Sequence, residues 1–131
     1  MIKELIDLVA YKHQIDLKRE EAKYMDTNWL LDEIISEIQE VKEEIKPNNT
    51  PHLEDELGDI LWGWLMLVEK IKDKGLVTSH KNIIKRCLKK YQERISPLTG
   101  TPIDNKTWQE VKERQKKELE KERRSSPNRP Y

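Results

Sequence analysis

Several features that mark particular protein classes are scarce or missing in this chain. A single cysteine, Cys87, among 131 residues excludes an intrachain disulfide and is typical of a reducing compartment. No apolar run approaches the roughly 20 residues that cross a bilayer, and the charged N-terminal segment has no signal-peptide core. Lysine plus arginine equals aspartate plus glutamate at 25 each, so there is no net charge to recruit nucleic acid or a membrane. These absences predict a soluble cytoplasmic protein with no nucleic-acid or membrane partner.

Helical periodicity organises the chain, with no strand alternation and no internal repeat. Hydrophobic residues make up 35% of it and charged residues 38%, a lean composition for the core of a monomer. The apolar spacing predicts five helices, over residues 2–24, 26–45, 51–74, 78–94 and 105–123. We therefore expect an all-α fold, an antiparallel helical bundle of four to five helices completed by oligomerisation into a homodimer or homotetramer. Residues 1–124 are interpreted as a single helical domain and 125–131 as a flexible tail.

Capping residues and glycines set the expected ends of the central helices. Asp26 or Thr27 is expected to cap the second helix. Thr50 is expected to cap the third, with Pro51 in its first turn and Gly75 just past its end. These residues leave a short loop between the second and third helices, which are then free to pack side by side.

The middle of the third helix, residues 60–68, is apolar on every side. A helix that is hydrophobic all round is buried all round. We therefore expect Trp62 and Met66, which lie away from the other apolar residues, at an interface with another subunit. Gly63 falls on the same side as Glu56 and is expected to allow a close helix crossing.

The other aromatic, histidine and cysteine side chains are given ordinary structural roles. Trp29 and Trp64 are interpreted as core residues, and Cys87 as a small core residue. His13 and His80 are interpreted as surface residues. No arrangement of histidine and aspartate suggests a nucleophile.

Two acidic pairs carry the chemistry that the sequence indicates. Glu37 and Glu40 are spaced i, i+3 in the second helix, so both carboxylates lie on one helical face. Glu56 and Asp59 repeat this spacing in the third helix, and the fifteen residues between the pairs let the chain turn back. Four carboxylates are then expected to converge. Two charges about 4 Å apart repel by roughly 4 kcal/mol at an effective dielectric near 20, so the cluster needs a cation, and its oxygen ligands suit Mg²⁺ or Mn²⁺.

These two helices resemble the metal-binding helices of the MazG-type nucleotide pyrophosphohydrolases. The signature of that family is E-E-x-x-E followed by E-x-x-D, and the chain shows it as residues 36–40 (SEIQE) and 56–59 (ELGD), with Ser36 in place of the first glutamate. The resemblance covers residues 27–117 and is most specific between 30 and 68. It implies that Mg²⁺, with Mn²⁺ as an alternative, is bound by Glu37, Glu40, Glu56 and Asp59.

The resemblance also implies an activity. MazG-like enzymes hydrolyse a nucleoside triphosphate between its α and β phosphates and release the monophosphate and pyrophosphate, so we expect an enzyme of this kind acting on an NTP or a dNTP. A carboxylate of the second helix, either Glu37 or Glu40, is expected to orient or deprotonate the attacking water. The RHPHVFG-type run that marks one branch of the family is missing, which leaves the subfamily open.

Four further residues are expected to bind the substrate. Lys85 and Lys89 are spaced i, i+4 on the fourth helix and can hold phosphate charge, although a solvated helix face explains them equally well. Trp108 and Lys112 resemble the late Trp-x-x-x-Lys element of the family. Trp108 is the residue expected to stack on the base.

Other functions stay open from the sequence. A dUTPase-like or phosphoribosyl-ATP-type pyrophosphohydrolase of the same superfamily shares these features, and base specificity would separate them. A non-enzymatic helical interaction module, whose acidic stripe is only a solvated surface, predicts no metal dependence. A ferritin-like di-iron bundle is excluded because it needs Glu-x-x-His pairs, and none of the three histidines follows a glutamate at that spacing.

Overall fold

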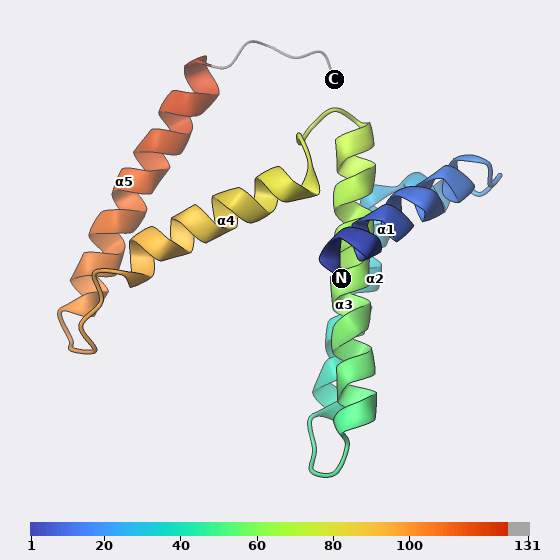
Figure 1. Ribbon diagram of the computed structural model, residues 1–131, viewed down its shortest axis with the longest axis horizontal. Coiled ribbons are helices and arrows are strands. Elements are labelled where there is room, and N and C mark those ends of the chain that lie inside the picture. Colours follow the sequence, from blue (N-terminus) through green and yellow to red (C-terminus); the bar gives the residue numbers. More distant parts are fainter. Residues whose placement is uncertain (126–131) are drawn as a thin grey trace. The chain divides into compact units, whose positions relative to one another are not determined.

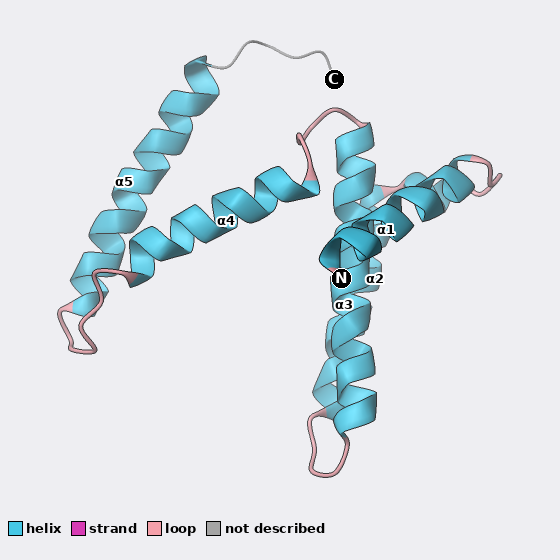
Figure 2. Ribbon diagram, viewed as in Figure 1, coloured by secondary structure: helices cyan, strands magenta, loops and turns pink. Residues whose placement is uncertain are grey.

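The structure is a computed structural model that describes residues 1–125, and its regular elements are all helices (Figures 1 and 2). The elements in chain order are α1 (Ile2–Leu17), the 3-10 helix η1 (Ala22–Met25), α2 (Thr27–Glu44), α3 (Thr50–Asp73), α4 (His80–Ile95) and α5 (Asp104–Ser125). No strand occurs within residues 1–125, so the all-α prediction is confirmed. The predicted flexible tail lies outside the described residues, apart from Ser125, which ends α5.

The chain divides into two compact units. The first runs from Met1 to His80 and contains α1, η1, α2 and α3, while the second begins at Lys81 and contains most of α4 and all of α5. The interpretation of residues 1–124 as a single domain stays a prediction, as does its completion by oligomerisation.

The antiparallel pair of α2 and α3 is the main packing contact of the first unit (Figure 1). The Asp26 side chain accepts a hydrogen bond from the Asn28 backbone N–H at 2.9 Å, as expected of an N-cap. Asn49, and not Thr50, occupies the cap position of α3, so that prediction is wrong. The Asn49 Nδ2 instead donates to the Glu44 carbonyl oxygen at 2.8 Å and thereby fastens the loop to the end of α2.

The two helices lie close together at Gly63. A Cβ atom built at this residue would lie 3.0 Å from Cγ1 of Ile34 on α2. Real Cβ atoms seldom come so near a neighbour, so the hydrogen of glycine is what lets α3 rest directly on Ile34. The close helix crossing expected from the sequence is present.

The first helix packs against α3 beside this crossing. Val9 of α1 packs with Leu65 and Met66 of α3 to form the buried core, and Trp62 packs against it. Met66 is only 5% exposed, so the prediction that it faces another subunit is wrong. The sequence did not show that α1 would occupy this face.

The N-terminal segment is shorter as a helix than predicted. Instead of continuing to residue 24, α1 ends at Leu17, and the chain re-enters as the single turn η1, which contacts both α1 and α2. Tyr24 lies in this turn, where Arg19 Nη2 donates to its hydroxyl at 2.7 Å. The turn therefore brings an aromatic ring back toward the start of α2.

Both histidines predicted to lie at the surface are buried. His80 is 3% exposed, and its Nε2 donates to the Leu65 carbonyl oxygen over 2.8 Å. His13 is 2% exposed, and its Nδ1 accepts from Lys70 Nζ at 2.8 Å. The predictions failed because each histidine finds its polar partner in α3, at a distance along the chain that helical periodicity does not reveal.

Polar contacts join α4 to α5 in the second unit. Arg94 Nε donates to Gln115 Oε1 at 2.8 Å, and Gln115 Nε2 donates to the Lys90 carbonyl oxygen at 3.0 Å. Cys87 is exposed, so its interpretation as a core residue is wrong. Across residues 1–125, no helix combines the length and the apolar character that crossing a membrane requires.

Replacing Gly63 with leucine is expected to destabilise the protein by about 1–3 kcal/mol, because an overfilled contact pushes α2 and α3 apart. Gly58 is the matched control on the same helix, since a Cβ atom there meets nothing within 4 Å. Gly58→Leu is therefore expected to keep or raise stability. Urea unfolding followed by circular dichroism measures both changes, and equal losses would contradict the close crossing.

Candidate metal centre

Four carboxylates from α2 and α3 converge in the first unit. Glu37 and Glu40 come from α2, and Glu56 and Asp59 come from α3. One oxygen from each can be chosen so that all four atoms lie within 4.8 Å of one another. The i, i+3 spacing puts each pair on one helical face, and the antiparallel packing turns the two faces toward each other.

Two of these carboxylates are half-buried and incompletely paired. Oε2 of Glu37 and Oε2 of Glu56 are shielded from solvent, and neither has a hydrogen-bond partner among the described residues. Within residues 1–125, no lysine or arginine forms an ion pair with any member of the quartet. Buried carboxylate oxygens without donors are costly, and a divalent cation would satisfy them. The residues present therefore fit an oxygen-ligated cation.

The crowding of the four carboxylates also raises the pKa values of two of them. Burial first, and then the neighbouring carboxylates of Glu40, Asp59 and Glu56, raise the pKa of Glu37 from its ordinary value of 4.5 to about 7. The pKa of Glu56 is also raised, mainly because its carboxyl group and that of Glu40 lie close enough to share a proton. These groups titrate as a set. Without a cation, the carboxylates reduce their mutual repulsion by binding protons.

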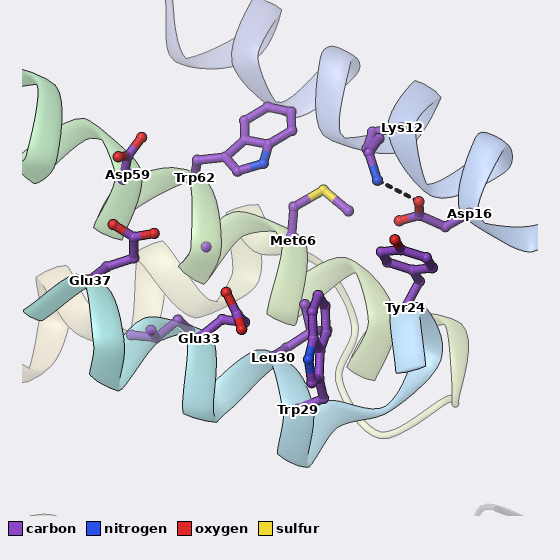
Figure 3. Close-up of a pocket in the computed structure, with 12 residues that line it drawn as sticks. Lys12, Asp16, Tyr24, Trp29, Leu30, Glu33, Glu37, Asp59, Trp62 and Met66 are labelled. Atoms are coloured by element: carbon purple, nitrogen blue, oxygen red, sulfur yellow. Dashed lines mark hydrogen bonds and ion pairs between the residues drawn. The ribbon is translucent and has the colours of Figure 1, made fainter. Parts of the chain in front are cut away.

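A cavity of about 300 Å³ adjoins the acidic cluster within the same unit (Figure 3). Glu37 and Asp59 line one side of it. Trp62 of α3 and Trp29 of α2 line it as well, and Met66 lies between them (Figure 3). Trp29, which we interpreted as a core residue, is half-buried and lines this cavity. The volume of the cavity is at the lower end of the roughly 300–1,000 Å³ that is usual for small-molecule sites.

The far side of the cavity carries an ion pair from α1. Lys12 Nζ donates to Asp16 Oδ1, and Tyr24 lies beside this pair (Figure 3). Sequence reasoning missed these three residues. The only signal was the i, i+4 spacing of Lys12 and Asp16 on α1, which is also a common pattern of an ordinary surface ion pair.

The four residues predicted to bind substrate belong to the second unit. Lys85, Lys89 and Lys112 are exposed, and the Lys89 Nζ lies 3.8 Å from a carboxylate oxygen of Glu93. Trp108 is half-buried, with its ring centre 6.5 Å from that of Tyr91. The four carboxylates of the cluster come together within the first unit. The substrate-binding roles of Lys85, Lys89, Trp108 and Lys112 stay predictions.

Comparison with known proteins gives one match. Residues 26–97 match the family model of the MazG nucleotide pyrophosphohydrolase domain, and this range contains all four carboxylates of the cluster. No curated protein and no solved structure was similar enough to count as a match.

In protein stripped of divalent ions, the free energy of unfolding is expected to fall as pH rises from about 4.5 to about 7. Folded Glu37 holds its proton more tightly than the unfolded chain does, so the stability present below the unfolded pKa is lost as pH rises through the folded pKa. Thermal unfolding in chelator across this pH range measures the effect. At pH 7, Mg²⁺ should raise Tm, because it binds the folded chain.

Glu37→Gln, which cannot ionise, should flatten this pH dependence. The matched control is Glu43→Gln, since Glu43 is exposed on the same helix and lies outside the quartet. A wild-type stability that is level between pH 4.5 and 7 would contradict the raised pKa.

Proposed function

The chain belongs to the MazG nucleotide pyrophosphohydrolase family, and from that premise we propose that it hydrolyses a nucleoside triphosphate, NTP or dNTP, between the α and β phosphates. The products are the monophosphate and pyrophosphate, and the cofactor is Mg²⁺, with Mn²⁺ as an alternative. The observation that carries this proposal is the quartet whose carboxylate oxygens lie within 4.8 Å of one another. No side chain of residues 1–125 neutralises the quartet by an ion pair.

The four carboxylates are assigned as ligands of the cation. A divalent ion bound there would neutralise phosphate charge and lower the pKa of a water molecule. The protein holds the ligands in place before any ion arrives, because helix packing fixes the backbones of α2 and α3. The assigned ligands are Glu37, Glu40, Glu56 and Asp59.

The carboxylate that orients the attacking water is assigned to Glu37. Of the two α2 carboxylates, Glu37 is half-buried and lines the cavity, whereas Glu40 is exposed. Glu37 is thus the α2 carboxylate that faces the cavity in which the substrate is proposed to bind, where it can accept a hydrogen bond from a water molecule.

The cavity beside the quartet suits the nucleoside of the same substrate. Trp29 and Trp62 offer aromatic faces to a base, and aromatic stacking accepts any base. A substrate bound with its base against these rings has its phosphates beside Glu37 and Asp59, which line the same cavity. We therefore propose that one nucleotide binds the quartet through its phosphates and the aromatic side of the cavity through its base.

A homo-oligomer, dimer or tetramer, is proposed as the working form. Both helices of the metal centre carry apolar side chains that remain exposed in the single chain. The exposed apolar residues are Leu31, Ile35 and Ile38 of α2, Ile45 directly after α2, and Leu57 and Leu61 of α3. Covering such residues with a second copy removes apolar area from water, which favours association.

Glu56→Gln is expected to reduce turnover of nucleoside triphosphates to below roughly one hundredth of wild type, the scale on which preorganised electrostatic groups act. The fold should persist, and the metal-free protein should become more stable, because one charge of the repelling quartet is gone. Glu54→Gln, which alters an exposed glutamate two residues earlier on α3, is the control and should retain activity.

The assay is a panel of ribo- and deoxyribonucleoside triphosphates incubated with Mg²⁺, with the products separated by ion-exchange chromatography. Monophosphate and pyrophosphate are expected. Release of only diphosphate and orthophosphate would show that a different bond is cut. Hydrolysis of dUTP alone would point to the dUTPase-like relatives, and inertness toward the whole panel, with no metal dependence, would favour a non-enzymatic helical module.

Ile35→Glu is expected to shift the protein toward the monomer, because it places a charge among the exposed apolar residues of α2. Sedimentation velocity measures the change in mass. Gln39→Glu adds the same charge at an exposed polar residue of α2 and should leave the assembly intact. A wild-type protein that sediments as a monomer at all concentrations would refute the proposed oligomer.

A further inference from the structure

We propose that Lys12 and Asp16 read the hydrogen-bonding edge of the nucleobase, and that they select bases in which an amino group stands next to an unprotonated ring nitrogen. Cytosine and adenine have such an edge, whereas uracil, thymine and hypoxanthine do not. This inference rests on the proposed function, since it concerns which nucleotide that site accepts.

The position of the pair supports this role. The cavity is lined by Glu37 and Asp59 on one side, and Lys12 and Asp16 lie across it beyond Met66 (Figure 3). A nucleotide with its phosphates at the carboxylate quartet therefore points its base toward α1. The ion pair is the part of the cavity wall that a base edge would meet.

The carboxylate of Asp16 is held rigidly. Asp16 is 3% exposed, and its Oδ2 accepts a hydrogen bond from Lys70 Nζ at 2.7 Å. Lys70 is fully buried and also donates to His13 Nδ1. A buried lysine that bridges two polar groups fixes both in one geometry. Lys70 and His13 are thus positioning residues, which act on the base only through Asp16.

The aromatic walls are fixed as well. Cζ of Arg19 lies 3.6 Å from the ring centre of Tyr24, and the rings of Tyr24 and Trp29 stand nearly perpendicular, at 84°, with their centres 5.5 Å apart. These contacts hold the Trp29 ring in place beside the cavity. A base that stacks there is restricted to one plane, so its edge meets Lys12 and Asp16 in a defined direction.

The chemistry of the pair decides which edge it accepts. Burial alone would raise the pKa of Asp16, but hydrogen bonds and charges from Lys12 and Lys70 hold that pKa below its ordinary value of 3.8. Asp16 is therefore a carboxylate that only accepts hydrogen bonds, and its two oxygens have lone pairs left beyond the two lysine contacts. The Lys12 ammonium group has three N–H donors, of which one hydrogen-bonds to Asp16, so two remain for a ligand.

Cytosine matches both groups, because its amino group donates to Asp16 and its ring N3 accepts from Lys12. Adenine offers the same order of donor and acceptor. Uracil reverses it, with a carbonyl oxygen facing the carboxylate and an N–H facing the ammonium group. A site built to pair with polar groups strongly rejects an analogue that leaves them unpaired.

The test compares kcat/KM for dCTP and dUTP, two substrates that differ at this edge. Wild-type enzyme is expected to prefer dCTP by at least about tenfold. Asp16→Asn is expected to bring the ratio close to one, because an amide both donates and accepts. Asp7→Asn is the matched control, since Asp7 is an exposed aspartate of α1 that pairs with Lys3 outside the cavity.

The outcomes separate this inference from the function on which it rests. A wild-type ratio at or below one overturns the inference while hydrolysis itself stands. An unchanged preference in folded Asp16→Asn overturns it too. If that variant does not fold, Lys12→Met replaces it, because Lys12 is partly exposed and its loss should also lower the ratio. Failure to hydrolyse any nucleotide would instead refute the proposed function.

Discussion

The repulsion among four carboxylates held between α2 and α3 is the constraint on which this structure depends. Their oxygens lie within 4.8 Å of one another, and burial together with the neighbouring charges raises the pKa of Glu37 to about 7. Helix packing must oppose this repulsion. The contact of Gly63 with Ile34 shows how tightly the two helices are joined. A divalent cation bound there would offset this repulsion, which is why we propose that the quartet binds one.

The first helix links the packing of the fold to the chemistry of the site. Its Val9 completes the core against α3, and the same helix brings Lys12 and Asp16 to the cavity beside the carboxylate quartet. The ion pair from Asp16 to Lys70 is almost completely buried, and such charges are tolerated only when they are well paired. Docking of α1 therefore fixes both the core and the wall of the cavity in which we propose that the nucleobase binds.

The sequence predicted the positions of the helices well, but it predicted poorly which parts of the chain pack against them. Each helix appeared close to its expected place except the end of α1, where the chain turns at Leu17 and forms the separate turn of Tyr24. The cap of α3 was assigned to Thr50, although Asn49 holds that position and pairs with the end of α2. Met66 was expected at a subunit interface because the apolar pattern of α3 shows that a face is covered but not by what.

The sequence by itself determined the helical class and the spacing of the two acidic pairs, because both depend on residues only a few positions apart. Only the tertiary structure decided that His13 and Asp16 meet Lys70, which lies 57 and 54 residues further along the chain. It also decided that a cavity lies between the carboxylates and α1. Such contacts depend on how helices dock, and the docking of whole helices is set by the fit of many side chains together, which no local pattern specifies.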